Sequence, residues 1–300
     1  MIRIAFLLLV AAMALPLSAQ PSTKTYAQEL VDKAVERHPE LLTLVMHVTP
    51  PKSSENVIIA SNNKAQIGKR ADADDLNVIK TGKPLLEVSS AGDRFEVQVV
   101  LQDVSMRTIG GLEMAFPYKA GDDKPQLEKK AEMIRNELRR RISHVANLVE
   151  PAQFDAQIPT NTYAQHLVDE VLAKHPEVLI LAFHATPPKS PENVIIASNI
   201  GRIGKKADED DMNVIKTGHP KLETNTEGDR FESEQALKDV SGDTIGAVGV
   251  VFAYKKGDDQ QTLHKKAEKI RNELQRRITN VGNLMEPFPI DPKFATSPSM

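Results

Sequence analysis

The sequence predicts an α+β protein of two tandem domains, each a five-stranded antiparallel sheet flanked by helices. One observation is a duplication, in which NVIIASN at Asn56–Asn62 returns unchanged at Asn193–Asn199, an offset of about 137 residues. The other is the order of patterns in each copy, which reads helix, two strands, helix, three strands, helix. Strands joined by short loops pair antiparallel, and helices over such a sheet define the α+β class.

The duplication extends over most of the chain. NVIKTG at Asn77–Gly82 returns at Asn213–Gly218, and IRNEL at Ile134–Leu138 returns at Ile270–Leu274. A period this long indicates tandem domains and not a solenoid. The predicted boundaries are a signal peptide over residues 1–19, Cache-like domains over 22–150 and 161–287, a linker over 151–160 and a flexible tail over 288–300.

The first half of each copy predicts one helix, two strands and a short helix. In the first copy the helix runs from about Thr25 to Arg37, with an apolar face at helical spacing. Strands over 41–48 and 57–62 follow, separated by a Pro-Pro turn. Asp72 begins the short helix and Gly82 ends it, because acids favour a helix start and glycine a left-handed stop.

The second half predicts three strands and a long helix. The strands lie near 84–88, 94–102 and 108–118, with turns at Ser90–Asp93 and Asp103–Arg107. A helix over 123–149 carries an apolar stripe from Leu127 to Val149.

The first residues predict export. Arg3, an apolar run over Ile4–Leu15 and a small-residue cleavage signature describe a secretory signal peptide cleaved between Ala19 and Gln20. A membrane anchor is the alternative, although spanning takes about 20 apolar residues. No other segment is apolar enough, so we expect a periplasmic or secreted chain without a transmembrane segment in its mature form.

Composition excludes several classes of chemistry. The chain has no cysteine, which excludes disulfides and cysteine-ligated metal. A net charge of −3 argues against a nucleic-acid partner. The acidic runs at Asp72–Asp75 and Asp208–Asp211 lack the glycine and closing glutamate of a calcium loop. HExxH, GxSxG and phosphate-binding loops are absent, so we expect no metal, no cofactor and no enzymatic activity, with a secreted enzyme of unknown type as an alternative.

Four phrases of each copy resemble a known family. In the first copy they are Val57–Asn62, Ile67–Lys69, Val78–Pro84 and Ile109–Tyr118. They resemble the Cache superfamily, the extracellular PAS-like sensor domains of bacterial receptors. The resemblance implies small-molecule recognition between the sheet and its overlying loops, with organic acids or amino acids as ligands.

The chain departs from that family in two respects. It has neither the membrane helix nor the output domain that usually accompany such sensors, so a membrane receptor or a second copy of the chain is an expected partner. It also has no tryptophan, and therefore lacks the family's aromatic amino-acid pocket.

His47 and His184 are candidate ligand-binding residues at the same place on the first strand of each copy. Each shares a strand face with mid-sized side chains, where a pocket fits, and an imidazole can donate to an anionic ligand. The alternative is a histidine satisfied by a backbone carbonyl.

Three further pairs are candidates. Arg94 and Arg230 begin a strand and can grip a carboxylate bidentately, or form ion pairs with Glu96 and Glu232. The others are lysines in the last turn of the short helix, where a cation is favourable on its own, and tyrosines ending the last strand, equally common at a core edge: Lys80, Lys216, Tyr118 and Tyr254.

Together these residues predict an exported ligand-binding or sensory protein that recognises a small, anionic metabolite such as an organic acid. The alternative is a structural or protein-interaction module of the cell envelope without a small-molecule ligand. Convergence of His47, Arg94 and Tyr118 on one pocket would favour the first.

Overall fold

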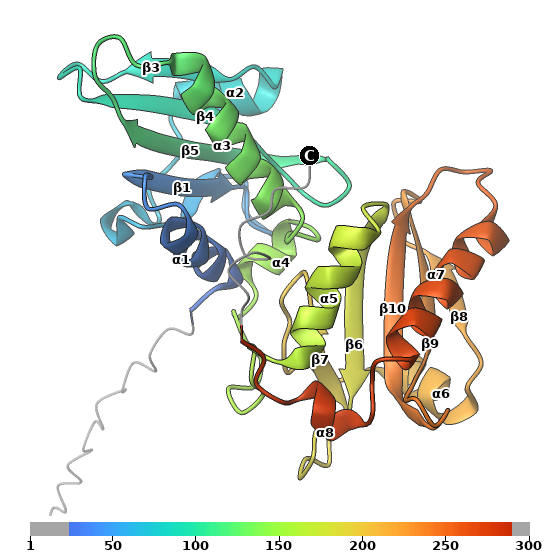
Figure 1. Cartoon of the computed structure of the whole chain (residues 1–300). Helices are drawn as coiled ribbons and strands as arrows, with labels where there is room; N and C mark the ends of the chain where they lie inside the picture. The colour runs from blue at the N-terminus through green and yellow to red at the C-terminus, as the bar shows by residue number, and fades with distance from the viewer. Residues whose placement is uncertain (1–23, 290–300) are drawn as a thin grey trace, which may run out of the picture.

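The protein contains two five-stranded antiparallel sheets, one in each repeat (Figure 1). The computed structural model describes residues 24–289, so the predicted signal peptide and all but two residues of the predicted tail lie outside the described residues. The strand orders are β2-β1-β5-β4-β3 and β7-β6-β10-β9-β8, the same in both repeats. The predicted fold class is confirmed.

The elements of the first repeat follow the predicted order, with an added 3₁₀ turn (Lys64–Gln66). They are α1 (Tyr26–Arg37), β1 (Thr43–Val48), β2 (Val57–Ser61), α2 (Ala73–Thr81), β3 (Leu85–Val88), β4 (Arg94–Gln102), β5 (Thr108–Pro117), α3 (Lys124–Arg139) and α4 (Val145–Val149).

The second repeat has the same order. Its elements are α5 (Tyr163–Lys174), β6 (Val178–Ala185), β7 (Val194–Ser198), α6 (Glu209–Thr217), β8 (Lys221–Thr224), β9 (Arg230–Lys238), β10 (Thr244–Ala253), α7 (Gln260–Gln275) and α8 (Val281–Leu284).

The short helices begin and end where the acids and glycines predict. The Asp72 side chain accepts from the backbone N–H groups of Asp74 and Asp75, and Asp75 completes a capping box. Gly82 ends α2 at φ 70°, a left-handed conformation that glycine adopts without strain. Asp208 and Gly218 repeat this arrangement in α6.

Different helices cover the two faces of each sheet. Leu44, Met46 and Val48 of β1 pack with α1 and α3 in the apolar core of the first repeat. The alternate residue His47 points to the other face, where it meets Asp75 of α2. The second repeat divides in the same way, with α5 and α7 on one face and α6 on the other. The face beneath α2 or α6 is therefore where the candidate histidines lie.

The predicted helix over 123–149 is wrong in one respect, because it is two helices. The chain leaves the helical path after Arg139, and the carbonyl of buried Ile142 accepts a hydrogen bond from Val104 N–H of the β4–β5 turn. The second repeat breaks in the same way, with Val240 N–H donating to Ile278 O. These tertiary contacts end the helix even though the apolar residues continue at helical spacing to Val149.

The repeats meet at a joint formed by side chains of both. Arg230 of β9 donates to the Asp103 carboxylate at 3.1 Å, to Ser105 Oγ at 2.7 Å and to the carbonyl of Ser143 at 2.8 Å. Arg202 forms a bidentate pair with Glu150. Within residues 24–289, no helix is both long and apolar enough to cross a membrane.

Candidate functional site

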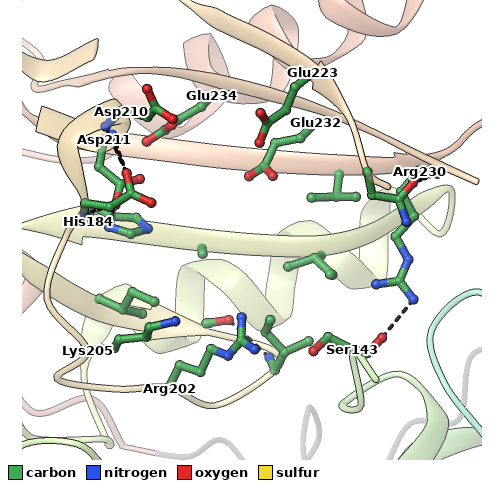
Figure 2. Close-up of a pocket in the computed structure, with 18 of the residues that line it drawn as sticks. Ser143, His184, Arg202, Lys205, Asp210, Asp211, Glu223, Arg230, Glu232 and Glu234 are labelled. Atoms are coloured by element: carbon green, nitrogen blue, oxygen red, sulfur yellow. Dashed lines mark hydrogen bonds and ion pairs between the residues drawn. The ribbon is translucent and has the colours of Figure 1, made fainter. Parts of the chain in front are cut away.

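A cavity of about 510 Å³ lies on the α6 side of the second sheet (Figure 2). Its floor includes Ile180 and Ala182 of β6 and Val251 of β10. The first repeat closes one end with Arg107, Ser143 and His144, so the cavity is built from both repeats.

The floor is open because two positions carry small residues in the second repeat. Gly249 of β10 pairs with Ala182 on one side and Glu234 on the other. A Cβ at Gly249 would lie only 2.7 Å from Oε1 of Glu232, so any side chain there would displace that carboxyl. The equivalent row of the first repeat holds Val45, Glu113 and Gln98, larger residues at the same register.

Two carboxyl groups on β9 face the cavity and form no ion pair with any described residue, although Lys221 lies near enough to Glu232 to lower its pKa slightly. Burial is the main cause that raises the pKa of Glu232 to about 7, and neighbouring acids add to it. Burial, followed by a hydrogen bond with Asp211, raises the pKa of Glu234 to about 9. Glu234 is 7% exposed, and its buried Oε1 has no hydrogen-bond partner in the described part of the chain. Such an atom is costly to leave unpaired.

Basic side chains lie on the opposite side of the cavity. Figure 2 shows Arg202 and Lys205, from the loop between β7 and α6, across strand β6 from the Glu232 and Glu234 carboxyls. The Arg202 guanidinium is paired with the Glu150 carboxylate. Lys205 Nζ, by contrast, forms no ion pair with any residue of the described range. The cavity therefore has an acidic wall and a basic wall.

The two candidate histidines differ in their hydrogen bonding, because the residue paired with the histidine is Gly111 in the first repeat and Ala247 in the second. His47 is 2% exposed, and its ring lies 2.8 Å from Asn56 Oδ1 and 3.3 Å from Asp75 Oδ1. This position requires Gly111, since a Cβ there would lie 2.3 Å from the ring. Burial lowers the pKa of His47, but the hydrogen bond and charge of Asp75 outweigh it and raise the pKa overall.

In the second repeat the residue paired with His184 is Ala247. His184 Nδ1 lies 3.3 Å from Asp211 Oδ2 but without the geometry of a hydrogen bond, and Asn193 Oδ1 is also left unpaired. Burial lowers the pKa of His184 and so favours its neutral form. His184 lines the cavity as a candidate hydrogen-bonding group.

The predicted arginines have other roles in the structure. Arg230 reaches the cavity edge, but its guanidinium is held by Asp103, Ser105 and Ser143 of the first repeat. Arg94 is exposed and lies 3.6 Å from Asp93. Neither forms the same-strand ion pair with Glu96 or Glu232 that the sequence offered as an alternative.

The structure does not bring the predicted lysines and tyrosines to the cavity. Lys80 and Lys216 are exposed in the last turns of α2 and α6. Tyr118 and Tyr254 contact buried rings of the helix-covered core, with centroids 6.0 Å from Phe95 and 6.3 Å from Phe231 respectively. Convergence of His47, Arg94 and Tyr118 on one pocket would have favoured ligand binding in the first repeat, but His47 and Tyr118 lie on opposite faces of one sheet.

The sequence reasoning missed Glu234, Ala182 and Gly249, and gave Glu232 only as an ion-pair partner. A signal was present, because residues 182, 234 and 249 differ from Val45, Gln98 and Glu113 at matched positions. Across residues 24–289, no group of three or more His, Asp or Glu side chains is arranged to hold a metal ion.

Comparisons with known proteins gave only remote structural likeness. No family model and no curated protein matches the chain. Among solved structures, the A. aeolicus nlh2 GAF domain in an inactive state is 14% identical, covers 39% of this chain and 85% of its own, and has a TM-score of 0.32. PelD 158-CT from Pseudomonas aeruginosa PAO1 is 12% identical, with 89% and 83% covered and a TM-score of 0.28. The RsbU periplasmic domain from Chlamydia trachomatis is 9% identical, with 86% and 81% covered and a TM-score of 0.25.

Proposed function

We propose that this chain is an exported, Cache-like sensory protein whose second repeat binds a small polar metabolite in the cavity beneath α6. The observation that carries the proposal is the unpaired Oε1 of Glu234, buried at the wall of a cavity of about 510 Å³. That volume lies in the usual range of about 300–1,000 Å³ for small-molecule sites. A ligand donor would satisfy the orphaned carboxyl oxygen.

The charges around the cavity favour a narrower class of ligand than the small anionic metabolite expected from the sequence. An anionic group fits the basic wall, where Lys205 forms no ion pair with a residue of the described range. A ligand that is anionic throughout would also face Glu232, Glu234 and Asp211. We therefore propose a ligand that carries a cationic group, such as an ammonium, toward the acidic wall and an anionic group toward Lys205. The expected organic acid becomes an aminocarboxylic acid or a related zwitterion.

Proton release should accompany binding of such a ligand. Glu232 and Glu234 have pKa values of about 7 and about 9 in the free protein, and a nearby cation favours their charged forms. The cation thus displaces protons, and affinity should rise as pH increases from 6 to 9. A binding role, and not a catalytic one, is proposed because His184 forms no hydrogen bond to a hydroxyl group among the described residues, and the Oγ of Ser198 in the cavity wall accepts from Ile200 N–H instead.

A thermal-shift screen tests this function. Aminocarboxylic acids, amines and organic acids are added to the purified chain, because a ligand of the native state raises the unfolding midpoint by mass action. We expect the aminocarboxylic acids to give the largest shift. The variant A182V/G249V places larger side chains on the floor, of which only the valine at 182 matches the first repeat, and should lose the shift, while the matched control K216A, outside the cavity, should keep it.

Two results would contradict the proposal. No shift from any compound at millimolar concentration would favour the alternative of a structural or interaction module without a ligand. A shift that persists in folded A182V/G249V would place the ligand elsewhere. Passing the signal to a membrane receptor is part of the proposed role and needs a partner beyond this chain.

A further inference from the structure

The joint between the repeats is asymmetric, since each repeat uses a different surface. The first repeat contributes its trailing surface, which we define as Asp103, Val104, Ser105 and Ser143. The second contributes its leading surface, defined as Asn199 and Arg230. Arg230 binds Asp103, Ser105 and the Ser143 carbonyl, and Asn199 donates to the carbonyl of Arg140 at 2.8 Å.

Because the domain is duplicated, each repeat possesses both surfaces, and one of each remains uncovered. The leading surface of the first repeat is Asn62 and Arg94. The trailing surface of the second repeat is Asp239, Val240, Ser241 and Thr279. The side chains of Asp103, Ser105, Asn199 and Arg230 have identical counterparts here, and the carbonyl of Thr279 takes the place of the Ser143 carbonyl.

Exposure shows that these two surfaces lack the cover that the inner joint supplies. Val104 is 2% exposed, whereas its counterpart Val240 is 53% exposed. The two turns share one local hydrogen bond, from the valine N–H to the carbonyl of Ile142 or Ile278, so local structure does not explain the difference. Arg230 is 8% exposed, and its counterpart Arg94 is an exposed side chain.

The uncovered surfaces also have complementary charges. Asp103 already pairs with Arg107 of its own turn at 2.7 Å. In the second repeat Asp243 replaces Arg107. Asp239 therefore accepts only backbone hydrogen bonds from Ser241 and Asp243, and forms no ion pair within residues 24–289. It is a buried carboxylate, 7% exposed, that an incoming guanidinium can reach as Arg230 reaches Asp103.

A hollow beside this turn completes the surface. It has a volume of about 410 Å³ and is lined by Val240, Asn272, Gln275 and Arg276. Arg276 is the counterpart of Arg140, whose guanidinium donates to the carbonyl of Leu172 across the inner joint. In a second copy the matching acceptor is the carbonyl of Val35 near the end of α1.

We propose that the leading surface of one copy of this chain docks on the trailing surface of another, with Arg94 entering the Asp239 turn. The contact joins two different surfaces, so each dimer leaves one of each free and growth continues as a linear chain unless the rotation closes a ring. The proposal goes beyond ligand binding and concerns surfaces away from the cavity.

Three differences should make this contact weaker than the inner joint. The Arg202–Glu150 pair has no counterpart, because the first repeat has no arginine between Ser61 and Lys69. Arg107 and Asp229 lie 3.5 Å apart in the inner joint, whereas their counterparts Asp243 and Asp93 repel each other. The repeats are also tethered, which supplies an effective concentration of order 1 mM that separate chains lack. Assembly should therefore depend on concentration, and D243R should strengthen it by restoring the missing cation.

Sedimentation velocity of the purified chain over a range of concentrations tests the proposal. We expect the mean mass of the wild type to rise beyond that of a dimer, and D243R to reach the same mass at a concentration at least about tenfold lower. R94E and V240K, both at exposed positions, should each stay monomeric. K80E, a charge reversal away from both surfaces, should behave as the wild type.

A mixture gives the sharpest result. R94E keeps its trailing surface and V240K keeps its leading surface, so an equimolar mixture should form dimers and nothing larger. The proposal is overturned if the wild type and D243R are both monomeric at their highest soluble concentrations. It is equally overturned if the oligomers of the wild type persist in R94E and V240K.

Discussion

Replacing Glu234 by glutamine should stabilise the protein above neutral pH and have little effect near pH 4.5. Glutamine cannot ionise, it can still donate to Asp211, and it is the residue at the matched position 98 of the first repeat. The sign follows from the raised pKa. The folded state holds a proton on Glu234 from pH 4.5 to about 9, while the unfolded chain has released it, so wild-type stability falls as pH rises through this window.

The magnitude follows from the same values. At pH 7.5 the unfolded carboxyl lies about three pH units above its pKa, which corresponds to at most ~4 kcal/mol at ~1.4 kcal/mol per unit. Solvent in the cavity lowers this, since effective dielectric constants of about 20 describe such sites. We expect E234Q to gain ~2 kcal/mol at pH 7.5, or roughly 4–8 °C in melting temperature for a chain of this size.

Urea unfolding of the wild type and E234Q at pH 4.5, 6 and 7.5 measures this effect. E87Q removes one charge from an exposed position on β3 and serves as the control, with an expected change under ~0.5 kcal/mol at every pH. Equal stability of E234Q and wild type at pH 7.5, or a gain that does not vary with pH, would refute the reasoning.

Three further predictions concern the first repeat and the joint. Gly111→Ala should displace the His47 ring and destabilise the protein by ~1–3 kcal/mol in urea unfolding; an unchanged midpoint would contradict the close approach. Arg230→Ala should cost ~2–3 kcal/mol and split the calorimetric transition in two, because Asp103 loses one of two cations; a single unshifted transition would count against it. Asp75→Asn should lower the His47 pKa in an NMR titration, because it removes the two largest causes that oppose burial and leaves the smaller effects of Asn56 and Glu113; an unchanged pKa would assign the shift to another group.

Much of the fold could be predicted because each helix and strand occurs in both repeats, so its sequence pattern can be compared between two copies. The acids and glycines that delimit α2 and α6 act locally, and local signals survive folding. The break after Arg139 could not be predicted, since it depends on a hydrogen bond between Ile142 and a turn about 40 residues earlier in the chain.

The candidate site was predicted only in part for a related reason. Identical residues in the two copies attracted attention, but His47 and His184 have different partners because Gly111 is replaced by Ala247. The cavity itself depends on differences, namely Ala182 and Gly249 in place of larger residues. Arg230 looked like a carboxylate binder, and it is one, but its carboxylate belongs to the first repeat.

The central claim is that the second repeat binds a small molecule and that the first does not share the site. The most direct measurement is a backbone NMR titration of the chain with the compound giving the largest thermal shift. We predict chemical-shift changes concentrated in β6, β9 and α6, with none around His47 and Glu113, and their loss in A182V/G249V. Changes centred on the first repeat, or spread evenly over both repeats, would contradict the claim.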